Sequence, residues 1–86
     1  MMNIVEVFVE DNCSSCEEVL RVLQGFEDQA RFLVRVWNRN SDAEEFQSRR
    51  VLLSPATFIN RRLVFYGAFS KDDFDRQLKL FRLKRF

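Results

Sequence analysis

Apolar and polar residues alternate along the chain in segments of two kinds. Stretches rich in Val, Ile and Phe predict strands over 3–10, 31–38, 56–60 and 63–69. Between them, apolar residues spaced three and four apart predict amphipathic helices. The predicted order of elements is therefore β-α-β-α-β-β-α.

The first helix is predicted over 14–25. Its apolar stripe recurs at helical spacing and consists of Cys16, Val19, Leu20 and Leu23. Gly25 follows this stripe, and glycine commonly ends helices. The helix therefore starts beside the two cysteines and ends at the glycine.

Capping signals mark the other two helices. Ser41, with Glu44 three residues later, forms a capping box and predicts a helix of about ten residues. Ser70 is a suitable N-cap for the last helix, and Asp72 and Asp73 lie in its first turn, where the helix dipole favours acids. The inner stripe of that last helix is predicted to be Phe74, Leu78 and Phe81, helped by Leu80 or Leu83.

This order predicts an α/β fold in one domain, residues 1–86. The first strand–helix–strand unit is long enough for a right-handed parallel crossover. The segment 56–69 should add an antiparallel hairpin to the same sheet, with Asn60 taking the left-handed conformation at its turn. We therefore expect a four-stranded mixed sheet with helices on both faces.

Composition narrows the classes of protein that fit. The chain has 86 residues, 47% of them hydrophobic, which suits a single small domain with a core. A net charge of +1 gives no field that would favour nucleic acid or a membrane. No apolar run approaches the ~20 residues of a membrane span. The first residues lack the basic and apolar regions of a signal peptide, so we expect a soluble, cytoplasmic protein.

The strongest candidates for reactive residues are Cys13 and Cys16, the only cysteines in the chain. They could form a redox pair, half of a metal site, or two inert buried thiols. Zinc needs four ligands, and the chain has no His and no further Cys. A metal site or an iron–sulfur cluster could therefore be completed only between two chains.

The position of these cysteines, together with two further landmarks, resembles the thioredoxin-like superfamily. Cys13-Ser-Ser-Cys16 stands at the first strand-to-helix junction, Ser54-Pro55 precedes the third strand, and Gly67 follows the last. The resemblance covers residues 3–83, and the compact length is most similar to glutaredoxins. It implies a thioredoxin-like fold and a thiol–disulfide oxidoreductase.

The resemblance also implies roles for individual residues. Cys13 would be the nucleophile and Cys16 the resolving thiol. Pro55 would be cis and lie against the cysteines, and Ser54 would offer its main chain to an extended substrate. Gly67 and Asp72 would complete substrate binding, with Asp72 contacting the amino group of glutathione.

Electrons would come from glutathione or from a reductase partner, with no bound cofactor. The substrates would be protein or small-molecule disulfides, and the protein would be a monomer. The chain departs from the family at Ser14-Ser15, which matches neither of its common active-site dipeptides, and at Val7, where thioredoxins carry a buried Asp. Ala68 stands where glutaredoxins have a second glycine.

The chemistry expected of the pair follows from its place at the helix start. Unpaired N–H groups and the positive end of the helix dipole favour a thiolate at Cys13. Cys16 should face inward, one turn away and close enough for a disulfide. The nearby acids Asp11, Glu17 and Glu18 oppose the thiolate, so we expect the pKa of Cys13 to fall only moderately below ~8.5.

Two other functions are compatible with the same residues. A thioredoxin-like domain can be redox-silent and serve as an interaction module. Alternatively, two copies could bridge an iron–sulfur cluster or a metal through their CxxC motifs. Thiol reactivity separates the first from an enzyme, and a coloured dimer would indicate the second.

Overall fold

The computed structural model describes residues 3–26 and 32–83, and it confirms the predicted order of elements. Residue 31, the predicted start of the second strand, lies outside the described residues. The elements are β1 (Asn3–Val9), α1 (Ser14–Gln24), β2 (Phe32–Asn38), α2 (Ala43–Ser48), β3 (Ala56–Ile59), β4 (Arg62–Tyr66) and α3 (Lys71–Leu83).

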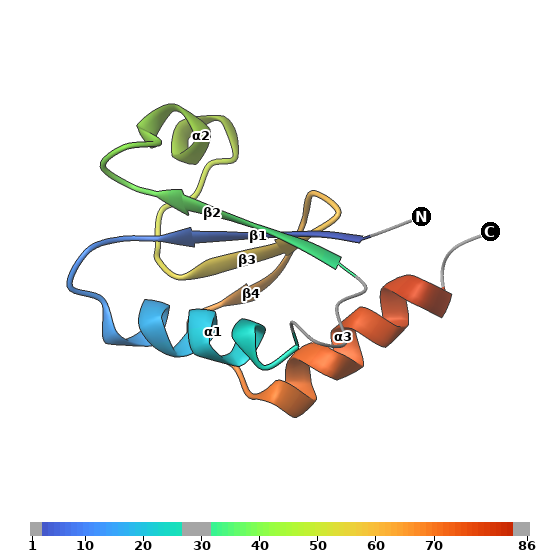
Figure 1. The fold of residues 1–86 in the computed structure, drawn as a ribbon. Coiled ribbons are helices and arrows are strands. Elements are labelled where there is room, and N and C mark those ends of the chain that lie inside the picture. The colour runs from blue at the N-terminus through green and yellow to red at the C-terminus, as the bar shows by residue number, and fades with distance from the viewer. Residues whose placement is uncertain (1–2, 27–31, 84–86) are drawn as a thin grey trace.

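The strands form one mixed sheet in the order β2-β1-β3-β4. β1 pairs with β2 in parallel and with β3 antiparallel, and β3 pairs antiparallel with β4. Helices α1 and α3 cover one face of this sheet, and α2 lies over one end of the other face (Figure 1). The predicted α/β architecture, with helices on both faces, is confirmed.

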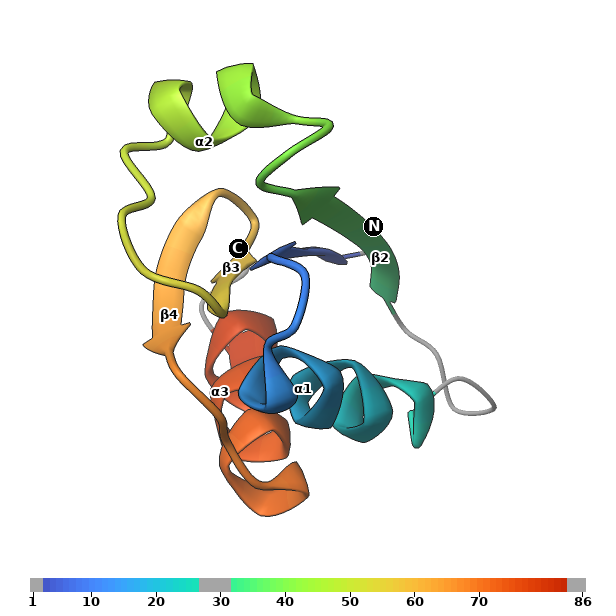
Figure 2. The ribbon, with the colours of Figure 1, turned by 90° about the vertical axis from the view of Figure 1, so that its left-hand side faces the viewer.

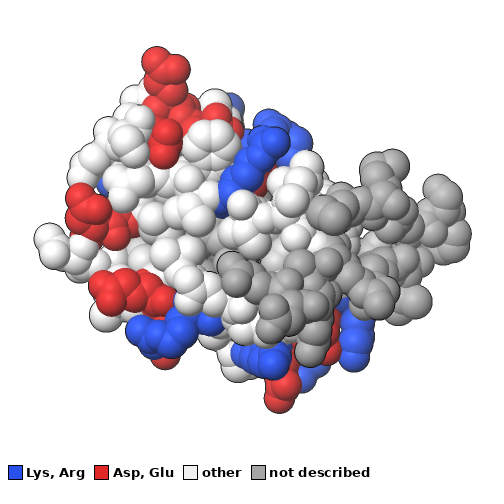
Figure 3. Space-filling view, in the orientation of Figure 1, with Lys and Arg blue, Asp and Glu red and all other residues white. Residues whose placement is uncertain are grey.

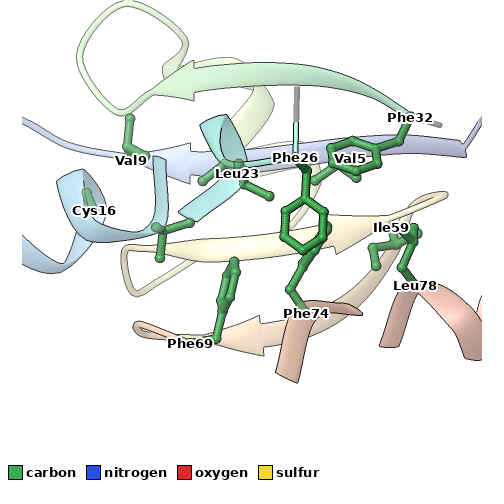
Figure 4. Close-up of a cluster of buried hydrophobic side chains, with 12 residues drawn as sticks. Val5, Val9, Cys16, Leu23, Phe26, Phe32, Ile59, Phe69, Phe74 and Leu78 are labelled. Carbon is green, nitrogen blue, oxygen red and sulfur yellow. The ribbon is translucent and has the colours of Figure 1, made fainter. Parts of the chain in front are cut away.

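The larger core lies between the sheet and the pair α1 and α3. Phenylalanines from four different segments meet there, as the close-up in Figure 4 shows for several of them. Phe74 of α3 is fully buried, with its ring 5.4 Å from that of Phe26 and 5.5 Å from those of Phe32 and Phe69. The buried members of this cluster are Val5, Val7, Val9, Cys16, Val19, Leu23, Phe26, Phe32, Ile59, Phe69, Phe74 and Leu78.

A smaller apolar cluster lies on the other face, beneath α2. Phe8 of β1 is at its centre, with ring centroids 5.0 Å from Phe46 and 5.2 Å from Phe58. Val51 and Ala56 complete the cluster, and Trp37 packs against it. Phe46 is the only buried residue of α2.

An ion pair is buried beside this smaller cluster. The Glu6 carboxylate, in the middle of β1, accepts hydrogen bonds from Arg49 Nη2 at 2.7 Å and from Trp37 Nε1 at 3.0 Å. Both charged side chains are less than a tenth exposed, at 7% for Arg49 and 4% for Glu6. Burial raises the pKa of Glu6, but the hydrogen bonds from Arg49 and Trp37 and the charge of Arg49 outweigh burial and hold that pKa below its ordinary value of 4.5.

The capping box predicted at Ser41 is wrong. The N-cap of α2 is Asp42, which makes no side-chain capping bond. Its carboxylate instead accepts from the Asn38 N–H at 2.9 Å and the Ser41 hydroxyl at 3.3 Å, in the turn that follows β2. The helix is also shorter than predicted, with 6 residues, because Arg50 adopts a left-handed conformation with φ 57°.

The last strand also ends earlier than predicted, at Tyr66 instead of residue 69. Gly67 has φ 85°, a conformation that turns the chain out of the strand and favours glycine. The turn between β3 and β4 consists of Asn60 and Arg61, with φ 50° and 69°. The left-handed conformation expected of Asn60 is therefore confirmed, and the turn has the two positive φ values typical of tight hairpins.

Strand β2 is an edge of the sheet and is largely exposed. Leu33, Val34 and Val36 are 53%, 41% and 48% exposed, and Arg35 lies between them. No helix within the described ranges is long and apolar enough to cross a membrane.

We expect Arg61→Gly to stabilise the protein by about 1 kcal/mol, because glycine adopts a left-handed conformation without the cost that a side chain brings. Urea unfolding monitored by circular dichroism measures this change. The matched control is Arg62→Gly, in the adjoining strand, which should destabilise the fold by ~0.5–1 kcal/mol. Equal effects of the two variants would contradict the assignment of strain to residue 61.

We expect Glu6→Gln to destabilise the fold by about 2 kcal/mol at neutral pH, because the buried Arg49 loses its closest carboxylate at 2.7 Å and keeps only that of Glu45 at 3.2 Å. The folded-state pKa of Glu6 is depressed, so its contribution is present above 4.5 and is lost as the pH falls through the lower folded value. The variant should therefore lose less stability than the wild type as the pH is lowered below 4.5.

Urea unfolding at a series of pH values tests this prediction. Glu44→Gln, a change at an exposed acid of α2, is the control and should alter stability by less than ~0.5 kcal/mol. Parallel pH profiles for wild type and Glu6→Gln would show that the ion pair does not contribute as described.

Candidate redox site

The turn between β1 and α1 places Cys13 at the start of the helix. Asn12 has φ 56°, which reverses the chain after β1. Cys13 is the N-cap of α1, in extended conformation with φ −122° and ψ 102°, and its carbonyl accepts from the Glu17 N–H at 3.2 Å. The predicted position of Cys13 is confirmed.

Cys13 and Cys16 form a disulfide across the first turn of α1, with their Cα atoms 5.2 Å apart. The Sγ atom of Cys13 accepts a hydrogen bond from the Cys16 N–H at 3.1 Å, and the Ser15 hydroxyl lies 3.9 Å from it. Cys16 is buried with 2% exposure, whereas Cys13 is half-buried. The Cys13 sulfur is thus accessible to another molecule, whereas the Cys16 sulfur is buried in the core.

The segment before β3 lies at the same end of the sheet as the cysteines. Phe8, next to the last residue of β1, pairs with Ala56, the first residue of β3. Pro55 therefore lies at the carboxyl end of β1, from which the chain leads to Cys13. Figure 2 views the molecule from this end, with the start of α1 in blue and the segment entering β3 in yellow. The Ser54–Pro55 bond is cis.

Gly67 is held against this segment by the main chain. Its N–H donates to the Pro55 carbonyl at 2.8 Å, beyond the last paired residues of β3 and β4. Pro55 itself is fully buried. Gly67 therefore supports the segment that carries Pro55, from its position after β4.

Among the described residues, Ser54 is bound through its side chain and not through its main chain. Its hydroxyl accepts from Arg39 Nη2 at 3.1 Å. Across residues 3–26 and 32–83, no hydrogen bond engages its N–H or carbonyl. These two groups are the ones that an extended substrate would pair with.

Asp72 is not joined to the other predicted site residues. It is exposed in the first turn of α3, and within the described parts of the chain no hydrogen bond or ion pair connects it to the cysteines or to the Ser54–Pro55 segment. The Asp73 N–H donates to the Ser70 hydroxyl at 3.1 Å, so the capping role predicted for Ser70 is confirmed.

The aromatic residues Trp37 and Tyr66 have different environments. Trp37 packs against the smaller core cluster and donates to Glu6, as described above. Tyr66 is 49% exposed and pairs with Ala56, immediately after Pro55. Of the two, only Tyr66 presents a surface next to the site.

Acidic side chains surround the start of α1. Glu10, Asp11, Glu17 and Glu18 are all exposed, and red patches occupy this end of the molecule in Figure 3. The Asp11 carboxylate accepts from the side-chain amide of Asn40 at 2.9 Å, which orients it but leaves its charge in place. The described residues contain no group of three or more His, Cys, Asp or Glu that could hold a metal ion.

Sequence reasoning missed Arg39. It follows β2 and reaches Glu10, the Leu52 carbonyl and Ser54. No local motif indicates such a role, because its partners come from two other loops of the chain. The parallel pairing of β1 and β2 was the one available signal, since it brings the residues after these strands together.

Solved structures with a similar fold are known, although the sequence comparisons found no match. No protein-family model and no curated protein sequence matches the chain. Among solved structures, thioredoxin-2 of a malaria parasite has a TM-score of 0.81 and 14% identity, over 92% of this chain and 82% of that one. The Fasciola hepatica thioredoxin has a TM-score of 0.74 and 14% identity, over 92% of this chain and 80% of that one.

Thioredoxin f2 of Chlamydomonas reinhardtii is similar over 98% of this chain and 80% of its own, with a TM-score of 0.70 and 17% identity. At sequence identities of 14–17%, these similarities establish the fold alone. The chain therefore has a thioredoxin-like fold, with a CxxC disulfide at the first strand-to-helix junction of that fold.

Proposed function

We propose that this chain is a thiol–disulfide oxidoreductase that reduces or exchanges disulfides of polypeptides. One observation carries the proposal: the half-buried Cys13 caps α1 and accepts a hydrogen bond from the Cys16 N–H, while Cys16 is buried beneath it. Donors and a helix dipole at a sulfur stabilise its thiolate, which is the attacking species in disulfide exchange.

The reaction proceeds in two exchanges. The Cys13 thiolate attacks one sulfur of the substrate disulfide, so that bond breaks, a mixed disulfide forms, and the other substrate sulfur leaves as a thiolate that takes up a proton. Cys16 then loses its proton and attacks the Cys13 sulfur. This forms the Cys13–Cys16 disulfide and releases the second substrate thiol, so two electrons have passed to the substrate.

An external dithiol, or two molecules of glutathione, returns the protein to its reduced state by the reverse exchange. No bound cofactor is needed, because the sulfurs themselves carry the electrons. We propose that the protein acts as a monomer in the cytoplasm, a compartment that keeps thiols reduced.

Polypeptide substrates fit the surroundings of Cys13 better than glutathione disulfide does. The carboxylates of glutathione disulfide outnumber its ammonium groups. The exposed acids Asp11, Glu17 and Glu18 surround the helix start, together with Glu10, whose carboxylate pairs with Arg39. Repulsion between these charges disfavours its approach. A polypeptide instead offers a main chain that can pair with the unengaged N–H and carbonyl of Ser54.

Cysteine variants test the proposal in an insulin-reduction assay with dithiothreitol as electron donor. Cys13→Ser should lose all activity above the background of dithiothreitol alone, because the attacking sulfur is gone. Cys16→Ser lacks the resolving thiol, so the reduced variant, freed of dithiothreitol and mixed with insulin, should accumulate a mixed disulfide through Cys13, detectable by mass spectrometry under non-reducing conditions. Ser48→Ala, on α2, is the control and should behave like the wild type.

If the wild-type protein reduced insulin no faster than dithiothreitol alone, the enzyme proposal would be wrong, and an interaction module would be favoured. A coloured, dimeric preparation would favour the cluster-bridging function instead. Retained activity in Cys13→Ser would show that the assignment of the nucleophile is wrong.

Salt dependence tests the substrate class. Raising the ionic strength from about 0.01 to 0.15 M shortens the screening length from ~30 to ~8 Å. The rate with glutathione disulfide should therefore rise about twofold or more, while the rate with the neutral hydroxyethyl disulfide stays constant. In the double variant Glu17→Gln, Glu18→Gln this salt effect should shrink; an undiminished effect would mean that these acids do not repel the substrate.

A further inference from the structure

Arg39 occupies the point where three segments around the site meet. It follows the last residue of β2, and its N–H donates to the Val9 carbonyl at 2.9 Å, which extends the pairing of β1 and β2 by one bond. Its main chain is thereby fixed to the strand that leads to Cys13. Its side chain is 36% exposed and turns toward the segment before β3.

The guanidinium of Arg39 contacts each of these segments. Its Nη2 donates to the Leu52 carbonyl at 3.1 Å and to the Ser54 hydroxyl at 3.1 Å, and its Nε lies 3.4 Å from the Glu10 carboxylate. Its Cζ lies 4.7 Å from the centre of the Phe46 ring, within the range of a cation–π contact. One side chain thus links the loop after β1, α2 and the segment that precedes Pro55.

The contacts leave the substrate-facing groups of that segment free. Arg39 holds the Leu52 carbonyl and the Ser54 hydroxyl, whereas the main-chain N–H and carbonyl of Ser54 have no partner within the described ranges. The side chains of Leu52 and Leu53 are 80% and 66% exposed. The segment is therefore fixed through the Leu52 carbonyl and the Ser54 hydroxyl, while the two leucines are exposed and the main-chain groups of Ser54 are not engaged by the described residues.

Building on the proposed oxidoreductase function, we propose that Arg39 is a positioning residue that holds Leu52–Ser54 in the conformation that binds an extended polypeptide beside Cys13. The substrate main chain pairs with Ser54, and an apolar substrate side chain packs on the exposed leucines. Preorganisation of this segment lowers the cost of ordering it when substrate binds. A small disulfide that contacts only the sulfurs gains nothing from Arg39.

The chemistry of arginine suits this task better than that of lysine. The planar guanidinium can donate to two acceptors, contact a carboxylate and stack on an aromatic ring at the same time. An ammonium at the end of a lysine has no planar face to lie on Phe46. Arg39→Lys should therefore retain the positive charge and lose most of the positioning.

The experiment compares two substrates for wild type, Arg39→Met and Arg39→Lys, with dithiothreitol as donor. For insulin, we expect KM to rise about tenfold in Arg39→Met and at least threefold in Arg39→Lys, with kcat changed less than twofold, since charged hydrogen bonds to the segment are lost. For hydroxyethyl disulfide, kcat/KM should stay within about twofold of wild type. Arg76→Met, on the exposed face of α3, is the matched control and should resemble wild type with both substrates.

Two further measurements separate positioning from other effects. The pH profile of Cys13 alkylation should be the same in wild type and Arg39→Lys, which shows that the change does not act through the thiolate. Ser54→Ala removes one acceptor and leaves Arg39 in place, so it should raise the insulin KM about threefold, and it remains informative if Arg39→Met does not fold.

Equal losses of kcat/KM with both substrates would overturn the role of Arg39. So would an unchanged kcat/KM for insulin in Arg39→Met and Ser54→Ala. Wild-type protein without activity toward either substrate would overturn the oxidoreductase function and this role with it. Active wild type with an unaffected insulin KM in the variants would overturn only the role of Arg39.

Discussion

The ion pair between Glu6 and Arg49 is the interaction on which the second face of the sheet depends. Helix α2 has 6 residues, far fewer than an isolated helix needs to be stable in water, and it buries only Phe46. Its C-cap residue, Arg49, is bound to the middle of β1, an inner strand of the sheet, and also contacts the rings of Phe8 and Phe58. The pair therefore supplies an attachment that the apolar surface of this short helix does not.

This attachment also determines where the site segment begins. The N–H of the buried Val51 donates to the Phe46 carbonyl at 2.9 Å, directly after the helix ends. The chain then exposes two leucines and returns to the core at Pro55. Because Arg39 rests on the ring of Phe46, the same helix supports the segment at its start and, through Arg39, near its end. The ion pair that attaches α2 to the sheet therefore also helps to fix the conformation of the segment between α2 and β3.

Local features of this chain could be predicted from its sequence, because their causes lie within a few residues. The stripe of α1 and the N-cap position of Cys13 depend on spacing and on a strand-to-helix junction. Asn60 at the hairpin turn depends on its tolerance of positive φ. Ser41 shows the limit of such local signals: a neighbouring acid, Asp42, became the N-cap, and its carboxylate bonded the preceding turn.

The long-range part of the site could not be predicted in this way. Arg39 and Arg49 are two of many arginines in the chain, and nothing near them in sequence identifies their partners. Glu6 and Arg49 stand 43 positions apart, and their contact depends on which face of the sheet α2 covers. A charge in the middle of an apolar strand does indicate that a partner must exist, since buried charges are paired, but it does not say which arginine supplies it.

The exposed edge of the sheet has a consequence for how copies of this chain behave at high concentration. Among the described residues, the outer edge of β2 pairs with no strand, and most of its side chains are apolar, the combination that lets sheets from separate molecules join edge to edge. Arg35 stands at the middle of this strand. If two such edges aligned antiparallel about their centres, the two guanidinium groups would be brought together, and their repulsion disfavours that register. A single charge in an otherwise apolar strand thus acts against the self-assembly that its neighbours would promote.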